Sequence, residues 1–485
     1  MSGNTAEGQV GSAAFWSYAG AFAERGLRFA VFVVIARFVL PEEFGIVVLA
    51  GLILSLFQDF SQIGMNEALV RRKDVDSLTF DSVFWFLIAI SGVATLIYLT
   101  GVMLFVDREN QALLWIVLLS LAPALPISSL GSVHHAHLLR DLGFKELTLR
   151  IVGASLASGV IAILLALAGW GIWALVAKSL LQALFQTALL WFFCDWRPSL
   201  RFSYEKLRPL MPDSLRLLGS GALTQFNQKG FDFAAGLLLS AAALGILRVA
   251  GQTILLLIEL TIGPMTMAAF AILSRYPDDP VVGRRTFALL TKSTALLVYP
   301  SFFGLAAIAD LLLPWVFGEQ WGQASAFVQL LALLALPVHL QLLLMAAFFA
   351  AGRTDRMLHW QIALSGATAL GIAIGTPFGL WGLAIATVAH FYILLPLGLW
   401  WMQRDTYFQI GELFRSIWPS FLCAGLMAIA VLGVKPAISG KLGTPLELAV
   451  LVAIGVALFG AAALLIAPDL LRAGLDGARR KFRPA

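Results

Sequence analysis

The chain has 485 residues, of which 60% are hydrophobic and 13% are charged. This composition leaves too little polar surface to cover a water-soluble globule, so it excludes a soluble protein and indicates a chain that lies mostly in lipid. The formal charge of +5 does not indicate a nucleic-acid partner, because the basic residues occur in short clusters between apolar runs.

Apolar runs long enough for membrane-spanning helices recur along the whole chain. Breaks at charged or Pro/Gly-containing gaps predict an all-α membrane protein with about fourteen transmembrane helices. In chain order they are expected at residues 15–36, 44–69, 80–106, 111–139, 147–168, 172–193, 213–239, 243–271, 286–308, 324–351, 357–376, 379–402, 416–434 and 445–467. The longest outer loops are expected at 309–323 and 435–444.

The distribution of Lys and Arg predicts the orientation. Of the 33 such residues, 22 fall in loops on the N-terminal side of the membrane or in the C-terminal tail, and four (Arg37, Arg108, Lys435 and Lys441) fall on the opposite side. Cytoplasmic loops carry the excess of positive charge in membrane proteins. Both termini are therefore expected in the cytosol.

An internal repeat divides the first twelve helices into two sets of six. Residues 44–51 (FGIVVLAG) align with residues 244–251 (LGILRVAG), with four identities in eight positions, and two further matches follow at offsets of 211 and 208. Six helices return the chain to its starting side, so the two repeats are parallel, an arrangement in which similar bundles can rock around a central site. We expect a cytosolic segment at 1–12, bundles at 13–196 and 213–403 joined by a linker at 197–212, two further helices within 404–467, and a basic tail at 468–485.

Charged residues inside the predicted helices are the candidate functional residues, because an ionised side chain in a bilayer should face protein or water. Seven basic and four acidic residues lie there, which is a net positive excess suited to an anionic headgroup such as pyrophosphate. The candidate basic residues are Arg25, Arg28, Lys178, Lys229, Arg248 and Lys292. For Lys178, Arg248 and Lys292 a second interpretation remains open, in which the side chains extend to the membrane interface.

Polar residues accompany these bases. Gln225, Gln228, Gln252, Gln182 and His390 are candidates for lining the same cavity, and Glu24, Asp59, Asp232 and Glu259 are candidates for ion coupling. Glu24 and Arg28 have the i, i+4 spacing of a helical ion pair, and Asp232 is three residues from Lys229. His134, His135 and His137 are expected to lie at the interface, and no metal site is expected because no acidic or cysteine ligand has suitable spacing.

Several segments resemble the polysaccharide transporters, the Wzx-type flippases of the multidrug/oligosaccharidyl-lipid/polysaccharide exporter superfamily. They are residues 35–45 (IARFVLPEEFG), 64–74 (GMNEALVRRKD), 242–245 (AALG), 273–275 (LSR) with 278–280 (DDP), and 317–321 (FGEQW). The resemblance covers roughly residues 10–405. It implies a bacterial inner-membrane protein in which two bundles form a V-shaped pair and move a polyprenyl-pyrophosphate-linked oligosaccharide outward by alternating access, for exopolysaccharide, capsule or O-antigen synthesis.

The resemblance also implies that Arg25, Arg28 and Lys229 engage the pyrophosphate. The acids beside them, Glu24 and Asp232, either lower the effective positive charge or serve coupling to a proton or sodium gradient, and no other cofactor is expected. The expected partners are the lipid-linked substrate, membrane lipids, and a polysaccharide polymerase with its export machinery. An ion-coupled multidrug exporter is the alternative function, and a membrane-embedded polymerase or acyltransferase is less favoured because the outer loops are short.

Overall fold

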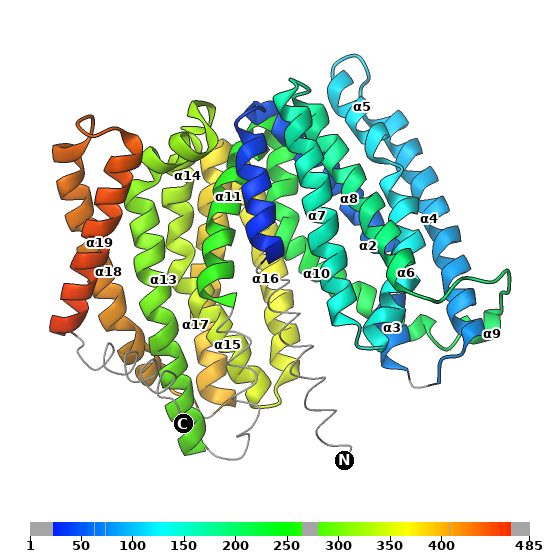
Figure 1. Ribbon diagram of the computed structural model, residues 1–485. Helices are drawn as coiled ribbons and strands as arrows, with labels where there is room; N and C mark the ends of the chain where they lie inside the picture. The colour runs from blue at the N-terminus through cyan, green and yellow to red at the C-terminus, as the bar shows by residue number, and fades with distance from the viewer. Residues whose placement is uncertain (1–22, 63, 73, 264–279, 407, 467–485) are drawn as a thin grey trace, which may run out of the picture. The chain divides into compact units, whose positions relative to one another are not determined.

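The computed structural model describes residues 23–62, 64–72, 74–263, 280–406 and 408–466, and these residues form helices and short connections without any strand (Figure 1). Each of the fourteen predicted helices has a helical counterpart, which confirms the all-α class. The predicted cytosolic segment at 1–12, the tail at 468–485 and the helical positions 15–22 and 264–271 lie outside the described residues.

The chain divides into two compact units, Met1–Lys229 with Ser240–Gly245, and Gly230–Leu239 with Ile246–Ala485. The bundle boundaries expected from the sequence stay a prediction. The first unit contains a helix over 23–36, α2 (Pro41–Gln62), α3 (Met65–Arg71), α4 (Ser77–Phe105), α5 (Ala112–Leu121), α6 (Ala124–Arg140), α7 (Phe144–Leu167), α8 (Ile172–Phe193), α9 (Tyr204–Leu207) and most of α10 (Met211–Ala234). The second unit contains the end of α10, a π-helical turn η1 (Ala235–Leu239), most of α11 (Ala241–Thr261), α13 (Pro280–Phe317), η2 (Glu319–Trp321), α14 (Ala324–Leu331), η3 (Ala332–Leu334), α15 (Ala335–Ala350), α16 (Thr354–Gly375), η4 (Thr376–Phe378), α17 (Gly379–Asp405), α18 (Ile410–Ile438) and α19 (Thr444–Ile466).

Two helices predicted as continuous in the first unit are broken. The helix expected over 44–69 divides into α2 and α3, because Gly64 adopts a left-handed conformation (φ 61°) that ends a right-handed helix. The helix expected over 111–139 divides into α5 and α6 at Ala122 and Pro123, where the proline ring lacks the N–H that a continuing helix needs.

The linker after α8 is fastened to the start of α4. Asp81 is 1% exposed, accepts the Ser199 backbone N–H at 3.0 Å and pairs with Arg201 at 2.9 Å. One turn further along α4, Trp85 donates its indole N–H to the Ser199 carbonyl oxygen at 2.8 Å. The buried residues Leu207 and Leu210 then join the core that α3, α4 and α6 form.

The second unit contains the longest helix in the described part of the chain. Helix α13 has 38 residues, against an expected span of 286–308, and continues through Pro300 and Pro314. The outer loop expected at 309–323 is therefore shorter than predicted. Helix α13 packs against α18 and α19 around a core that includes Ile308, Met427 and Leu451.

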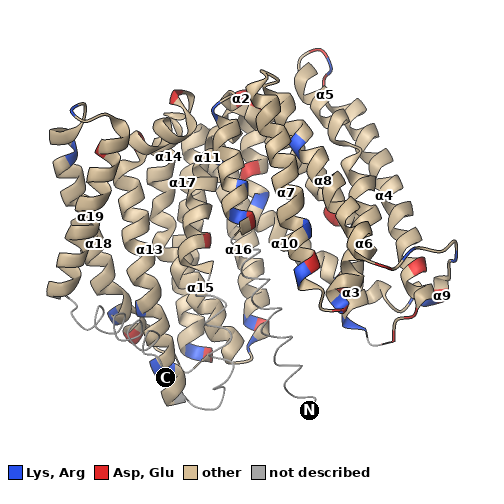
Figure 2. Ribbon diagram, in the orientation of Figure 1, with Lys and Arg blue, Asp and Glu red and all other residues tan. Residues whose placement is uncertain are grey.

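Eleven helical stretches within the described residues are long and apolar enough to cross a membrane, and one of these, Thr354–Asp405, contains both α16 and α17. Figure 2 shows that most of the length of α4, α18 and α19 carries no charged residue. The helix over 23–36 and α10 are not among the eleven, and they carry Glu24, Arg25, Arg28, Lys229 and Asp232. The protein is a multi-pass membrane protein.

Candidate functional site

The helix over 23–36 and α8 bring together the first group of predicted site residues. Arg28 pairs with Glu24 one turn away at 3.5 Å, which confirms the pairing expected from their spacing. Lys178 of α8 lies close enough to interact electrostatically with Arg28 and Glu24. The Arg28 side chain is 46% exposed and Arg25 is half-buried. Two positive groups from different helices therefore share one acid.

Helices α2 and α10 form a second group within the first unit. Lys229 donates to the Ser55 hydroxyl at 2.9 Å and lies 4.0 Å from a carboxylate oxygen of Asp59. Gln225 donates its amide N–H to the same carboxylate. Because Ser55 and Asp59 are one turn apart on α2, and Gln225 and Lys229 are one turn apart on α10, the two pairs face each other side by side.

The second unit contains a third group. Asp232, near the end of α10, accepts a hydrogen bond from Arg248 of α11 at 2.7 Å. With its amide oxygen turned toward Arg248, Gln252 accepts from the same guanidinium at 2.9 and 3.2 Å. The Arg248 side chain remains 34% exposed. The guanidinium is thus held in one orientation with part of its surface accessible.

The remaining candidates are less closely connected. Half-buried positions are occupied by Gln182 and Glu259, and exposed positions by Gln228 and Lys292. His390 is buried, donates Nδ1–H to the Ala386 carbonyl oxygen at 3.0 Å and packs against Phe231 with 5.2 Å between ring centroids. The assignment of Gln182, Gln228, Lys292 and His390 to a cavity, and of Glu259 to ion coupling, stays a prediction.

One residue of the second group was missed from the sequence. Ser55 was not singled out, because a serine in an apolar helix most often bonds its own backbone. Ser55 does so, donating to the Leu52 carbonyl oxygen at 2.7 Å, and its lone pair also accepts from Lys229. Its position one turn before the predicted Asp59 was the only signal available.

The expectation that the histidines at the end of α6 lie at the membrane interface stays a prediction, and His134 is enclosed by protein. Its side chain is fully buried, with 4.5 Å between its ring centroid and that of Trp191, and 5.0 Å to Trp196. The aromatic rings at the end of α8 and in the linker enclose it. Among the residues that the structure describes, no group of three or more His, Cys, Asp or Glu side chains could hold a metal ion.

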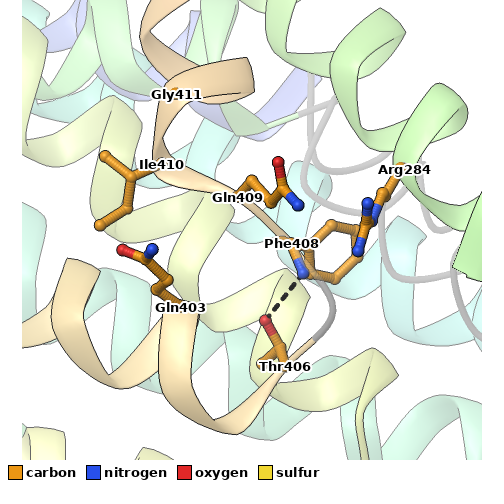
Figure 3. Close-up of a pocket in the computed structure, with 7 residues that line it drawn as sticks. All are labelled: Arg284, Gln403, Thr406, Phe408, Gln409, Ile410 and Gly411. Carbon is orange, nitrogen blue, oxygen red and sulfur yellow. Dashed lines mark hydrogen bonds between the residues drawn. The ribbon is translucent and has the colours of Figure 1, made fainter.

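A pocket in the second unit lies apart from these groups (Figure 3). Arg284 comes from α13, and the other lining residues come from the end of α17, the start of α18 and the segment between them. The lining residues are Arg284, Gln403, Thr406, Phe408, Gln409, Ile410 and Gly411. The ring of Phe408 packs against Phe287 in a tilted arrangement, with 4.2 Å between ring centroids. None of the predicted site residues lines this pocket.

The three groups share one chemical design. Each places a Lys or Arg beside a carboxylate within a multi-pass membrane protein, and in each the base keeps part of its surface exposed. In the second and third groups neutral polar side chains add hydrogen bonds. Such a base can donate charge-assisted hydrogen bonds to phosphate oxygens, and the neighbouring acid offsets the cost of keeping the charge in a medium of low dielectric constant. This arrangement suits the binding of an anionic headgroup rather than bond-making chemistry.

The sequence pattern of a known family, described as polysaccharide biosynthesis protein, matches residues 34–326. The chain belongs to this family. The match includes α2, α10 and α11, and thus every residue of the second and third groups.

Three curated relatives of this family member have names that refer to polysaccharide synthesis or transport. The succinoglycan biosynthesis transport protein ExoT of Rhizobium meliloti is 27% identical, over 66% of this chain and 64% of its own length. The teichuronic acid biosynthesis protein TuaB of Bacillus subtilis is 26% identical, over 78% of this chain and 79% of its own length. The lipopolysaccharide biosynthesis protein WzxC of Escherichia coli is 24% identical, over 67% of this chain and 66% of its own length.

Solved structures show the fold of the family member. The lipid II flippase MurJ, in an inward closed conformation, superposes with a TM-score of 0.76 at 15% identity and covers 94% of this chain and 99% of its own. An inward-facing multidrug resistance transporter of the MATE family, in the MOP superfamily, superposes with a TM-score of 0.58 at 16% identity. It covers 81% of this chain and 99% of its own. The fold is therefore similar to that of these two transporters, in agreement with the expected all-α membrane class.

Proposed function

We propose that this protein is a flippase that moves a polyprenyl-pyrophosphate-linked oligosaccharide across the bacterial inner membrane by alternating access. The observation that carries the proposal is that basic side chains within a multi-pass membrane protein are oriented by polar partners, as in the Ser55–Asp59–Lys229 group. A diphosphate needs such donors, because it cannot enter hydrocarbon without compensation of its charge. Membership of the polysaccharide biosynthesis family and the similarity of the fold to a lipid II flippase support the substrate class.

Under this proposal both termini lie in the cytosol, and the chain catalyses no covalent reaction. Glu24, Asp59 and Asp232 each have a basic partner, so a proton or sodium ion bound at one of these acids would weaken the hold on that base. We propose this as the coupling step between an ion gradient and substrate movement. A polysaccharide polymerase and an export system would use the product on the outer side.

The test replaces Arg25, Arg28 and Lys229 together with Ala in a strain that needs this gene for surface polysaccharide. We expect export to fall by at least about tenfold, because each charge-assisted hydrogen bond contributes roughly 1.5–3 kcal/mol. The matched control replaces Arg108, Arg285 and Lys441, which are exposed bases outside the three groups, and should export normally. Immunoblots of isolated membranes confirm that both proteins insert.

Normal export by the first triple variant, at normal protein levels, would contradict the proposal. The multidrug alternative predicts a different result, in which loss of the gene changes drug susceptibility and leaves surface polysaccharide intact. Measuring both properties in the deletion strain therefore separates the two functions.

A further inference from the structure

Helices α2 and α11 come into backbone contact near their first turns. A carbon atom added at Cβ of Gly45 would lie 1.7 Å from the carbonyl oxygen of Ala241, and one added at Gly245 would lie 2.1 Å from the carbonyl oxygen of Pro41. Favourable C–H···O contacts between helices have carbon–oxygen distances of about 3.3–3.6 Å. Neither position therefore has room for any side chain. All four residues belong to the first unit.

The contact is reciprocal, and the internal repeat explains why. An offset of 200 residues relates Pro41 to Ala241 and Gly45 to Gly245. Gly45 of the first repeat contacts Ala241 of the second, and Gly245 of the second contacts Pro41 of the first. The two repeats thus touch through equivalent positions. The first turn of α11, up to Gly245, belongs to the first unit, whereas the rest of that helix belongs to the second.

A contact made only of backbone suits reversible closure. The nearest atoms that an added Cβ carbon would meet at either glycine are all backbone atoms, so this contact can break without any change of rotamer. Small residues are what allow membrane helices to approach this closely. Pro41 and Ala241 each begin a helix, at the ends that the charge distribution assigns to the outer side of the membrane. The crossing is therefore expected on the side from which the substrate would leave.

We propose that the crossing of Gly45 and Gly245 closes the outer side of the transport path and separates when the path opens outward. The proposal rests on the proposed flippase function and on its orientation. A side chain at either glycine prevents closure and shifts the protein toward outward-open states. A covalent link across the crossing has the opposite effect and holds the outer side closed.

The first experiment tests closure by substitution. The variant carries Gly45→Ala and Gly245→Ala, and the matched control carries Gly51→Ala and Gly251→Ala, which are repeat partners on the same two helices with no atom within 4 Å of the added carbon. Both changes add the same two methyl groups, so they differ only in the space available. We expect export to be lost in the variant and retained in the control.

The reactivity of an introduced cysteine toward an impermeant thiol reagent reports directly whether the outer side of the transport path is open. The two buried cysteines, Cys194 and Cys423, are first replaced with Ala, and Gly26→Cys is introduced on the helix over 23–36, where no atom lies within 4 Å of an added carbon. An impermeant thiol reagent is added to spheroplasts. We expect labelling to rise by about tenfold in the Gly45/Gly245 variant, as for a shift of population between two states, and to stay at the parental level in the control.

A second experiment keeps both glycines and so avoids any clash. Pro41→Cys and Ala241→Cys are combined in the cysteine-free background and joined with a short, reducible bifunctional thiol reagent. We expect the linked protein to lose export and to regain it after reduction, whereas each single-cysteine protein is unaffected by the reagent. Normal export by the linked protein, or equal labelling of the glycine variant and its control, overturns the proposal.

The experiments distinguish an error in the role of the glycine crossing from an error in the proposed flippase function. If the substrate is not a lipid-linked oligosaccharide, the triple alanine variant described above exports normally, yet thiol labelling at position 26 still responds to the glycine substitutions. If only the role of the crossing is wrong, the triple alanine variant loses export and the labelling does not change.

Discussion

The side chain of Lys229 is positioned by two neighbours on α2 that play different roles. Asp59 supplies charge at 4.0 Å, and Ser55 supplies a directed acceptor at 2.9 Å. A lysine has a long, flexible stem, so a short directed hydrogen bond limits where its ammonium group can lie. Ser55 is therefore expected to act as a positioning residue for Lys229.

Replacing Ser55 with Ala should lower export by about fivefold, because a single hydrogen bond contributes roughly 1 kcal/mol. Ser55→Thr keeps the hydroxyl and should restore most of the activity. The control is Ser61→Ala on the same helix, since Ser61 donates to the Gln58 carbonyl oxygen just as Ser55 donates to that of Leu52. Export is measured as surface polysaccharide per cell at equal protein level. Full activity of Ser55→Ala in a strain where Lys229→Ala is inactive would contradict this role.

The candidate site could be predicted from the sequence only in part at this scale. Lys229, Asp59 and Arg248 stand out because charged residues are rare in apolar runs. Their partnerships did not follow from spacing, because Asp59 and Gln225 are 166 residues apart and meet only through tertiary packing. The local pair of Glu24 and Arg28 was predictable because helix geometry alone brings i and i+4 together.

At the scale of the elements, the start of α4 shows how the linker after α8 is held. Asp76 caps the helix by accepting the Thr79 backbone N–H at 2.9 Å, and it pairs with Lys206 of α9 at 2.6 Å. Together with Asp81 and Arg201 these contacts fasten residues 199–206 to one helix end. The linker was predicted to exist from composition, but its attachment depends on contacts between residues more than 100 positions apart.

Hydrogen bonds from the Lys206 ammonium and from the Thr79 hydroxyl and backbone N–H hold the pKa of the Asp76 carboxyl well below its usual range. A lowered pKa in the folded state stabilises the protein above the unfolded-state value of about 3.9, and this contribution is lost as the pH falls below that value. Asp76→Asn keeps a capping oxygen and removes the charge. We expect it to lower the melting temperature in detergent at pH 7, with a smaller difference from wild type at pH 3.5.

Asp76→Ala removes the cap as well and should cost about 0.5–2 kcal/mol at both pH values. Since the Asp76 side chain is half-exposed, added salt should reduce the effect of Asp76→Asn and leave the capping effect largely unchanged. An Asp76→Asn protein whose loss of stability grows as the pH is lowered would show that the charge does not act in this way.

The helix positions were predictable because each apolar run is long enough to cross a bilayer, but the breaks within them were not. A hydropathy average does not register the left-handed backbone at Gly64 or the missing N–H at Pro123. Pro314 gave the opposite error, because it lies in the loop expected at 309–323 and α13 continues through it. A proline in a membrane helix is tolerated where neighbouring helices satisfy the freed carbonyl groups, and the sequence does not reveal which neighbours are present.

For the whole molecule, the charge distribution makes a prediction that the helices alone do not. In the cysteine-free background, Glu109→Cys lies in the segment between α4 and α5 and should react with an impermeant thiol reagent added outside spheroplasts. Asp74→Cys lies between α3 and α4 and should react only after the membrane is permeabilised. Both positions are exposed, so a difference in labelling reports the side of the membrane. Labelling of Asp74→Cys from outside would reverse the orientation proposed here.

The fold class and the family were predictable because they depend on features spread over the whole chain, such as apolar run lengths and the repeat at an offset of 200. The glycine crossing was not, although both glycines stand in the aligned segments. Among matched glycines, Gly51 and Gly251 look the same in sequence as Gly45 and Gly245, and only the coordinates show that one pair has open space and the other has none.

Gly45 and Gly245, which are 200 residues apart, thus occupy one crossing that has no room for a side chain at either position. This predicts how mutations at the two positions combine. Because a methyl group at either position obstructs the same crossing, the second substitution adds little to the harm done by the first, and the two effects should be strongly non-additive. Restoring one glycine would not rescue the loss of the other. Since the repeat places both residues in the same contact, we expect the two positions to be constrained together in the two halves of the chain.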